Sequence, residues 1–301
     1  MLTRFNVFSP IPKVKFKLNK NNTGEYYNST RKAAFDNVET INNKEILLEV
    51  LNIYDKYLSN YTNALYHNLE TLEFKITDSI NCEGYYKLDY KNNLCILKDA
   101  KLLPAYHELI HIASSYYNKD KNELYSGFLY SSNFGINLGE GITEGYVELL
   151  CSRHLNNNFL TYNFLTYNYD INDDSCTTSY LYANILAHQL EILIGEEEMK
   201  YMFFNYGFFP INEFISKHTD QKTAYKFFKY CDIAAISDFH RDLILNAYIF
   251  KAQNILYDIC KNYMPEKQMD LERYLVYNLN IPTCVALQEE IQKRHIKSLE
   301  V

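Results

Sequence analysis

The feature that most constrains the fold of this chain is one segment, Tyr106-His107-Glu108-Leu109-Ile110-His111-Ile112-Ala113. Its two histidines are four residues apart, and side chains at this spacing project from the same face of an α-helix, one turn apart. The remaining positions are mostly apolar, as expected of a helix that packs behind a sheet and presents one polar stripe to a cleft. The segment therefore predicts a helix over 101–117 that directs His107 and His111 at a common point.

Two imidazoles directed at one point are suited to hold a zinc ion, which neutral imidazole binds at about 2 Å. Glu108 directly follows the first histidine, so it can take a proton from a water molecule beside the ion and later pass it to a leaving amine. This HExxH pattern on a helix is typical of zinc peptidases. We therefore predict that His107 and His111 are metal ligands and that Glu108 is the general base. The alternative is a pair of packing histidines beside a surface glutamate.

A catalytic zinc site needs a third protein ligand, because such sites keep three and leave the fourth position to water. The arrangement HExxHxxGxxH is excluded, since Ser114 and Tyr117 stand where Gly and His are required. The other common source is a glutamate on a following helix, in an E-x-x-x-[D/E] pattern. Glu140 and Glu144 have this spacing on a helix predicted over 140–154. Either carboxylate could reach the ion, and the other could accept a hydrogen bond from a ligand histidine.

At these residues the chain resembles the gluzincins, the thermolysin-like group of zinc peptidases, and their Gram-positive bacterial relatives with an N-E-G-[IL]-T-E segment. The resemblance covers 101–150, and a weaker one follows at Tyr182–Gly195. The family places the ligand glutamate first and a supporting carboxylate one turn later. The resemblance therefore implies Glu140 as the third ligand of Zn²⁺ and Glu144 as the carboxylate behind a ligand histidine, His107.

The chain departs from the family pattern at two points. Gly139 stands where the family often has Asn immediately before the ligand glutamate, and the nearest asparagine is Asn137. The Gly-x-Met-Glu-Asn signature of the aminopeptidase branch is absent from the chain. The resemblance therefore implies an endopeptidase rather than an exopeptidase.

Peptide hydrolysis also needs a hydrogen-bond donor for the oxyanion of the tetrahedral intermediate. The resemblance implies a His or Tyr that precedes the glutamate helix or follows it toward the C-terminus. The candidates are Tyr130, Tyr180, Tyr182 and His188. We select His188, which lies on the helix with the weaker resemblance, and Tyr130, which lies ten residues before Glu140. The sequence does not rank them.

The arrangement of hydrophobic residues predicts an α+β, zincin-like fold of two subdomains that share a cleft. A sheet-containing N-terminal subdomain is expected over 1–155, a connector over 156–177, and an all-helical subdomain over 178–301. In the first, the expected elements are an irregular lead-in over 1–40 with a possible strand at 14–18, a helix over 44–66, a strand at 72–76, a hairpin over 85–98, and loops over 118–139. In the last, helices are expected over 179–194, 197–205, 222–236, 238–262, 268–279 and 283–297, with breaks at Gly195, Gly207, Pro210, Pro265 and Pro282.

Composition excludes several classes of function. The net charge of −7 argues against a nucleic-acid-binding protein, which needs a basic face. No apolar run approaches the ~18 residues of a membrane span. The seven cysteines form no CxxC pair, which argues against a disulfide framework and favours a reducing compartment. The N-terminus lacks the apolar stretch of a signal peptide, so a cytoplasmic protein is expected.

The expected function is a zinc-dependent endopeptidase whose substrate is an extended peptide, paired with an edge strand near 85–98. Two alternatives stay open. The first is a zincin scaffold kept for peptide binding or regulation with little turnover, although such a protein would not need the base Glu108. The second is a metal-dependent hydrolase of a non-peptide bond.

Overall fold

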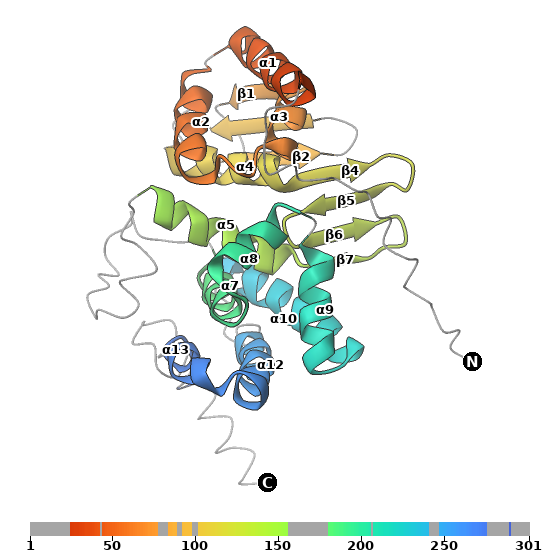
Figure 1. The fold of residues 1–301 in the computed structure, drawn as a ribbon, viewed down its shortest axis with the longest axis vertical. Helices are drawn as coiled ribbons and strands as arrows, with labels where there is room; N and C mark the ends of the chain where they lie inside the picture. The colour runs from red at the N-terminus through yellow and green to blue at the C-terminus, as the bar shows by residue number, and fades with distance from the viewer. Residues whose placement is uncertain are drawn as a thin grey trace.

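The computed structural model describes residues 25–42, 44–77, 84–88, 92–97, 102–155, 180–205, 207–240, 247–275 and 289 of the 301-residue chain. The predicted strand at 14–18, connector at 156–177 and helix at 283–297 lie outside these residues. Over the described part the chain is an α+β protein with a helical C-terminal part, as predicted, and it contains two small sheets where the sequence predicts one (Figure 1). None of its described helices is long and apolar enough to cross a membrane.

The first sheet lies at one end of the molecule together with the N-terminal helices (Figure 1). Its strands are β1 (Glu73–Thr77), β2 (Gly84–Leu88) and β3 (Asn92–Leu97). The strand order is β1-β3-β2, with β1 parallel and β2 antiparallel to β3. This is the small mixed sheet that the sequence predicts, and β2 is an edge strand of it.

Three helices cover this end of the chain: α1 (Glu25–Thr40), α2 (Glu45–Leu58) and α3 (Asn63–Leu69). The expected single helix over 44–66 is divided between α2 and α3. The expectation of an irregular lead-in over 1–40 is wrong for α1. This helix has few apolar residues, but Ala34 and Val38, one turn apart, are fully buried, and α1 packs against α3. Tertiary burial rather than local pattern stabilises it.

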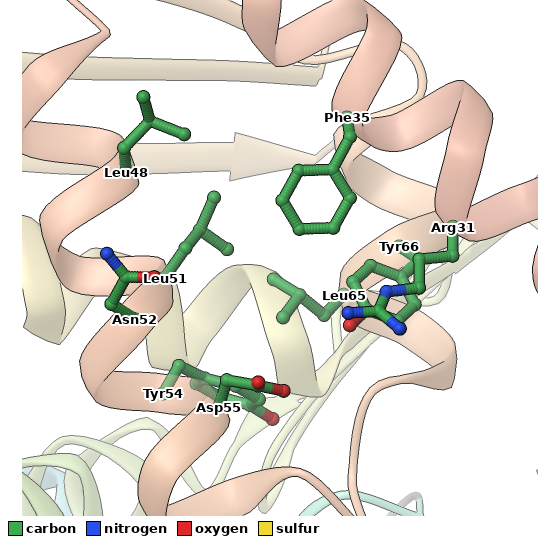
Figure 2. A pocket seen from close by; sticks show the side chains of 9 residues that line it. All are labelled: Arg31, Phe35, Leu48, Leu51, Asn52, Tyr54, Asp55, Leu65 and Tyr66. Atoms are coloured by element: carbon green, nitrogen blue, oxygen red, sulfur yellow. The ribbon is translucent and has the colours of Figure 1, made fainter.

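A pocket of about 250 Å³ lies among these three helices (Figure 2). Its buried floor includes Leu51, Leu65 and Tyr66, while the exposed side chains of Arg31 and Asp55 lie at its rim. No residue that lines it comes from the segments that carry the predicted metal ligands, so the pocket is separate from the site described below.

The HExxH segment forms α4 (Leu102–Ser114), as predicted, and packs against β2 and β3. Leu109, Ile110 and Ile112 of α4 are fully buried, whereas His107 and His111 each keep about a tenth of the side chain exposed, at 12%. The apolar side chains of α4 are therefore buried, against α2 and α3 as well as the sheet, and the two histidines keep a small exposed fraction.

A second sheet follows α4, where the sequence predicts only loops over 118–139. Its strands are β4 (Ser115–Asn118), β5 (Glu123–Ser126), β6 (Leu129–Ser132) and β7 (Asn137–Leu138), all antiparallel in that order. The prediction of loops is wrong. Strands of two to four residues are too short to show a clear alternation, and tyrosine, which is frequent here, favours strands only through its neighbours across the sheet.

The C-terminal part is helical over the described residues, as predicted. It contains α7 (Leu181–Ile194), α8 (Glu196–Phe203), α9 (Phe208–His218), α10 (Gln221–His240), α12 (Tyr248–Tyr263), a 3₁₀ turn (Pro265–Lys267) and α13 (Gln268–Glu272). It is preceded by α5 (Glu140–His154), the helix predicted at the end of the N-terminal subdomain. Helix α9 is not predicted from the sequence, because a proline at position 210 indicates a break. Pro210 lies in the first turn of α9, where a missing N–H costs nothing.

Helix α5 is the central element of the fold and contacts α4, α7 and α10. Two glycines of α5, Gly141 and Gly145, allow α10 and α7 to approach its backbone closely. A Cβ atom on Gly145 would lie 2.1 Å from the carbonyl oxygen of Ala183 in α7, and one on Gly141 would lie 2.3 Å from that of Cys231 in α10. These two contacts fix the position of α5 along its own axis relative to α7 and α10. They therefore also fix the position of Glu144, which lies between the two glycines.

We expect Gly145→Ala to lower the free energy of unfolding by about 1–3 kcal/mol, because the added methyl group meets backbone atoms that cannot rotate away. Denaturant titration followed by circular dichroism measures the change. Gly135→Asn is the control, since no atom lies near that position and asparagine tolerates its positive φ of 75°. Equal stability of Gly145→Ala and the wild type would contradict the close packing of α5 on α7.

Candidate metal centre

Three ligand atoms converge where α4 faces α5. The Nε2 atoms of His107 and His111 lie 3.2 Å apart. The carboxylate of Glu144 reaches both of them, at 3.1 Å from His107 Nε2 and 3.3 Å from His111 Nε2. All three side chains are largely buried, with 12–16% of each side chain exposed. This group of two histidines and one glutamate could hold a metal ion.

The spacing of the two histidine nitrogens is compatible with a tetrahedral metal ion. Zinc binds imidazole nitrogen at about 2.0–2.1 Å, so two ligand atoms of a tetrahedral site are about 3.3–3.5 Å apart, and the two Nε2 atoms are 3.2 Å apart. Each oxygen of Glu144 lies beside a different histidine, Oε2 at 3.1 Å from His107 Nε2 and Oε1 at 3.3 Å from His111 Nε2. Two imidazoles and one carboxylate are also a donor set that catalytic zinc sites use. The three residues could therefore hold a metal ion.

The state of Glu144 is suited to a ligand. Burial acts to raise the pKa of its carboxyl group, but the charges and hydrogen bonds of His111 and His107 hold that pKa well below its usual range. Glu144 is therefore ionised at neutral pH. An anionic carboxylate between two imidazoles offers a metal cation both charge compensation and a coordinating oxygen.

The second nitrogen of His107 is also engaged. Its Nδ1 atom lies 3.3 Å from the carboxylate of Glu148, one turn beyond Glu144 on α5. The thiol of the buried Cys151 is hydrogen-bonded to the same ring. A carboxylate at Nδ1 fixes the orientation of the imidazole ring. Glu148 is therefore positioned to orient His107.

The structure places Glu140 differently from the sequence-based assignment. Glu140 begins α5 and its side chain is exposed, and it is not part of the group of ligand atoms. In the structure Glu144, one helical turn beyond the predicted ligand Glu140, is the carboxylate beside the two histidines, and Glu148 is the carboxylate beside Nδ1 of His107.

The predicted base Glu108 lies beside the ligands, between α4 and the edge strand β2. A Cβ atom on Gly84 would approach its Cγ to 3.3 Å, so the glycine that begins β2 leaves room for this side chain. The carboxylate accepts a hydrogen bond from the backbone N–H of Tyr86. Burial raises the pKa of Glu108, against the opposing charges of His107 and His111. A raised pKa brings a carboxylate closer to what a general base needs at neutral pH.

The start of α5 is held by an aspartate from a distant part of the chain. Asp232 of α10 accepts hydrogen bonds from the backbone N–H groups of Gly139 (3.1 Å) and Gly141 (2.8 Å). Burial raises the pKa of Asp232 to about 6, against these hydrogen bonds. Gly139 has a φ of 92°, and a Cβ atom there would lie 2.1 Å from the carbonyl oxygen of Phe128, so glycine is required at this turn.

The two residues selected as oxyanion donors lie among other groups. Tyr130, on β6, donates a hydrogen bond to Glu123 and packs against Phe208 and Phe209. His188 lies 4.2 Å from the ring of Tyr274 (centroid to centroid), and burial lowers its pKa to about 4. His188 follows the start of α7 by seven residues, about 10 Å along the helix axis. The structure brings neither residue to the metal ligands.

Of the candidate oxyanion donors, Tyr180, which directly precedes α7, lies beside His107. Its ring is nearly parallel to that of His107, with the centroids 6.4 Å apart. Burial, followed by the charge of Glu144, raises the pKa of its hydroxyl group, so the hydroxyl stays protonated and able to donate a hydrogen bond. The remaining candidate, Tyr182, is fully buried in the core.

Sequence reasoning missed Glu148, Cys151, Asp232 and Gly84. Glu148 was within reach, because the E-x-x-x-[D/E] pattern occurs twice in α5, once at Glu140 with Glu144 and again at Glu144 with Glu148. Asp232 and Gly84 come from distant segments, and no local pattern marks them.

The comparisons with known proteins add no family. No protein-family model, no curated protein and no solved structure matches the chain.

Proposed function

We propose that this protein is a zinc-dependent peptidase with a zincin-like active site, an endopeptidase that hydrolyses extended peptides. The observation that carries the proposal is the convergence of His107, His111 and Glu144 on one point beside Glu108. Three ligands with a neighbouring carboxylate are what a catalytic zinc site needs, because the fourth position is left for water. A purely structural zinc site would be closed by a fourth protein ligand instead.

A bound zinc ion would supply Lewis acidity, which polarises a carbonyl group and makes water a better nucleophile at neutral pH. In this proposal Glu108 removes a proton from the attacking water. The same carboxyl group then returns the proton to the nitrogen of the departing amine, so the peptide bond breaks and Glu108 is a carboxylate again. Its raised pKa assists the first step by increasing the basicity of the carboxylate.

The edge strand β2 supports a peptide as the substrate. It runs beside Glu108 and pairs with β3 on one side only within the described sheet. An extended peptide can add to such an edge through backbone hydrogen bonds, which do not depend on the side chains of the peptide. We assign the role of oxyanion donor to Tyr180 in place of Tyr130 and His188, because its ring stacks on that of His107.

Metal analysis and peptide cleavage test the proposal together. We expect about one zinc ion per chain and cleavage of internal bonds in a peptide library, both lost on treatment with a chelator and restored by zinc. Cleavage should yield fragments from the interior of N- and C-terminally blocked peptides, as an endopeptidase requires. A protein that binds zinc but leaves every peptide intact would exclude the peptidase and favour the binding scaffold.

A further inference from the structure

The pocket among α1, α2 and α3 combines an apolar floor with charged groups at its rim (Figure 2). Helix α1 contributes Phe35 and Arg31 to it, and α2 contributes Leu51 and Asp55. In each pair the two residues are four apart, so both side chains project from the same face of their helix. Each of the two helices therefore presents one apolar and one charged side chain to the same cavity.

The guanidinium group of Arg31 is held in place by two aromatic rings. Its Cζ atom lies 5.7 Å from the ring centroid of Phe35 and 5.9 Å from that of Tyr66. Within the described segments the side chain of Arg31 forms no ion pair and no hydrogen bond. A guanidinium group that is positioned by stacking keeps its planar fork of N–H donors for another partner. The fork matches a carboxylate, which it binds through two parallel hydrogen bonds.

The rim also carries acceptor groups, which come from α2. Asp55 and Asn52 are three residues apart on this helix, and both side chains are exposed at the pocket. Neither forms an ion pair or a side-chain hydrogen bond with another residue of the described segments, and Asp55 does not pair with Arg31 although both line the pocket. An ammonium group has three donors for such oxygens. The rim therefore offers one position for an anion and another for a cation.

The floor and the volume of the pocket limit the size of a ligand that contacts both positions. Leu65 and Leu51 are buried, with 1% and 6% of their surface exposed, and the half-buried Leu48 extends the apolar wall. The volume of about 250 Å³ equals the share of about eight water molecules. A molecule of that volume is about as large as leucine, and burial of its apolar part against these side chains favours binding.

We propose that this pocket binds a free apolar amino acid of about the size of leucine, as its zwitterion. The carboxylate of the ligand accepts hydrogen bonds from Arg31, its ammonium group donates to Asp55, and its side chain lies against the leucines of the floor. The two charges of the rim cancel, so a ligand with one charge would cover the other without a partner, which is costly. A zwitterion pairs both charges.

The proposal is independent of the proposed peptidase function, because the residues that line the pocket come from other segments than the metal ligands.

Isothermal titration of the zinc-loaded protein with leucine and two analogues tests the pairing of each charge. Leucine amide lacks the carboxylate, and isocaproate lacks the ammonium group. We expect leucine to bind with a Kd of about 1 mM or lower, and each analogue to bind about tenfold more weakly, because it loses one charge-assisted contact. In Arg31→Gln, leucine and leucine amide should bind with nearly equal Kd values. In Asp55→Asn, leucine and isocaproate should do so.

Three variants serve as controls for the pocket. Lys32→Gln and Glu49→Gln remove exposed charges from the same two helices, at positions that do not line the pocket, and both should keep the wild-type Kd. Leu48→Trp fills the cavity without changing a charge. It should abolish leucine binding and leave the circular dichroism spectrum unchanged, since this side chain is only half-buried.

Leucine can also chelate zinc through its amino and carboxylate groups, so the titration must separate the pocket from the metal centre. Glu144→Ala, which is expected to lose zinc, should bind leucine with the wild-type Kd. Loss of binding in this variant, with full binding in Leu48→Trp, would place the ligand at the metal and overturn the proposal.

Three further results would also overturn it: no binding of leucine at about 10 mM, equal Kd values of leucine and its analogues for the wild type, or a preference for leucine over leucine amide that persists in Arg31→Gln. None of these measurements requires turnover. A protein that cleaves no peptide would therefore count against the proposed peptidase, while the same titrations still decide whether the pocket binds an amino acid.

Discussion

Glu144→Ala is expected to lose nearly all bound zinc, because it removes one of three ligand atoms together with the negative charge between His107 and His111. Glu148→Ala should weaken zinc binding by about 10–100-fold, the usual effect of removing a carboxylate that orients a ligand histidine. Glu140→Ala should leave zinc affinity close to that of the wild type, since this carboxylate is not in the ligand group. The loss of zinc affinity is thus expected to be largest for Glu144→Ala, smaller for Glu148→Ala and smallest for Glu140→Ala.

Competition against a fluorescent zinc chelator measures these affinities, and circular dichroism checks that each variant is folded. Glu144→Gln serves as a matched variant, because it keeps the size of the side chain and removes its charge. The loss should be larger for Glu144→Ala than for Glu148→Ala. If Glu140→Ala were the most zinc-deficient of the series, the assignment implied by the family resemblance would be right and the geometric one wrong.

Glu108→Gln is expected to bind zinc normally and to lose turnover by about 10²–10⁴-fold, the contribution typical of a positioned general base. The amide keeps the shape of the side chain but cannot accept a proton from water. Because the same change leaves the ligand atoms intact, peptide binding should persist. Single-turnover cleavage of a fluorogenic peptide, with zinc content measured on the same sample, provides the test.

Tyr180→Phe is the companion variant, and it removes one hydroxyl group near His107. We expect a fall in kcat of at most ~10²–10³-fold, the effect of losing one oxyanion donor, with little change in KM. Tyr130→Phe, on β6, is the matched control and should keep wild-type kcat. Undiminished cleavage by Glu108→Gln would exclude the base assignment, and equal effects of the two tyrosine variants would exclude Tyr180 as the donor.

Several parts of the fold follow from local sequence. The mixed sheet, α4 and several C-terminal helices have apolar patterns long enough to mark their period, whereas α5 is indicated by the spacing of its glutamates. The structure differs where the local signal is weak. Helix α1 has few apolar residues, the strands β4 to β7 have at most four residues each, and α9 contains a proline in its first turn. In each case contacts with distant segments outweigh the local preference.

For the candidate site, the sequence determined what depends on one helix alone. His107, Glu108 and His111 lie within two turns of α4, and the helical repeat brings the two histidines to one face regardless of the rest of the fold. The same argument puts Glu140, Glu144 and Glu148 on one face of α5. The helical repeat alone cannot tell which of these glutamates lies beside the histidines. If α5 moved along its axis by one turn, another glutamate would lie opposite the two histidines.

Only the tertiary structure decided which of the three glutamates meets the histidines. The position of α5 along its axis is set by contacts that no local pattern reveals. Gly145 packs against the backbone of α7, Gly141 packs against the backbone of α10, and Asp232 accepts hydrogen bonds at the start of the helix. These contacts bring Glu144 level with His107 and His111 and leave Glu140 outside the ligand group. One helical turn is 5.4 Å, so the packing between helices determines which glutamate lies beside the two histidines.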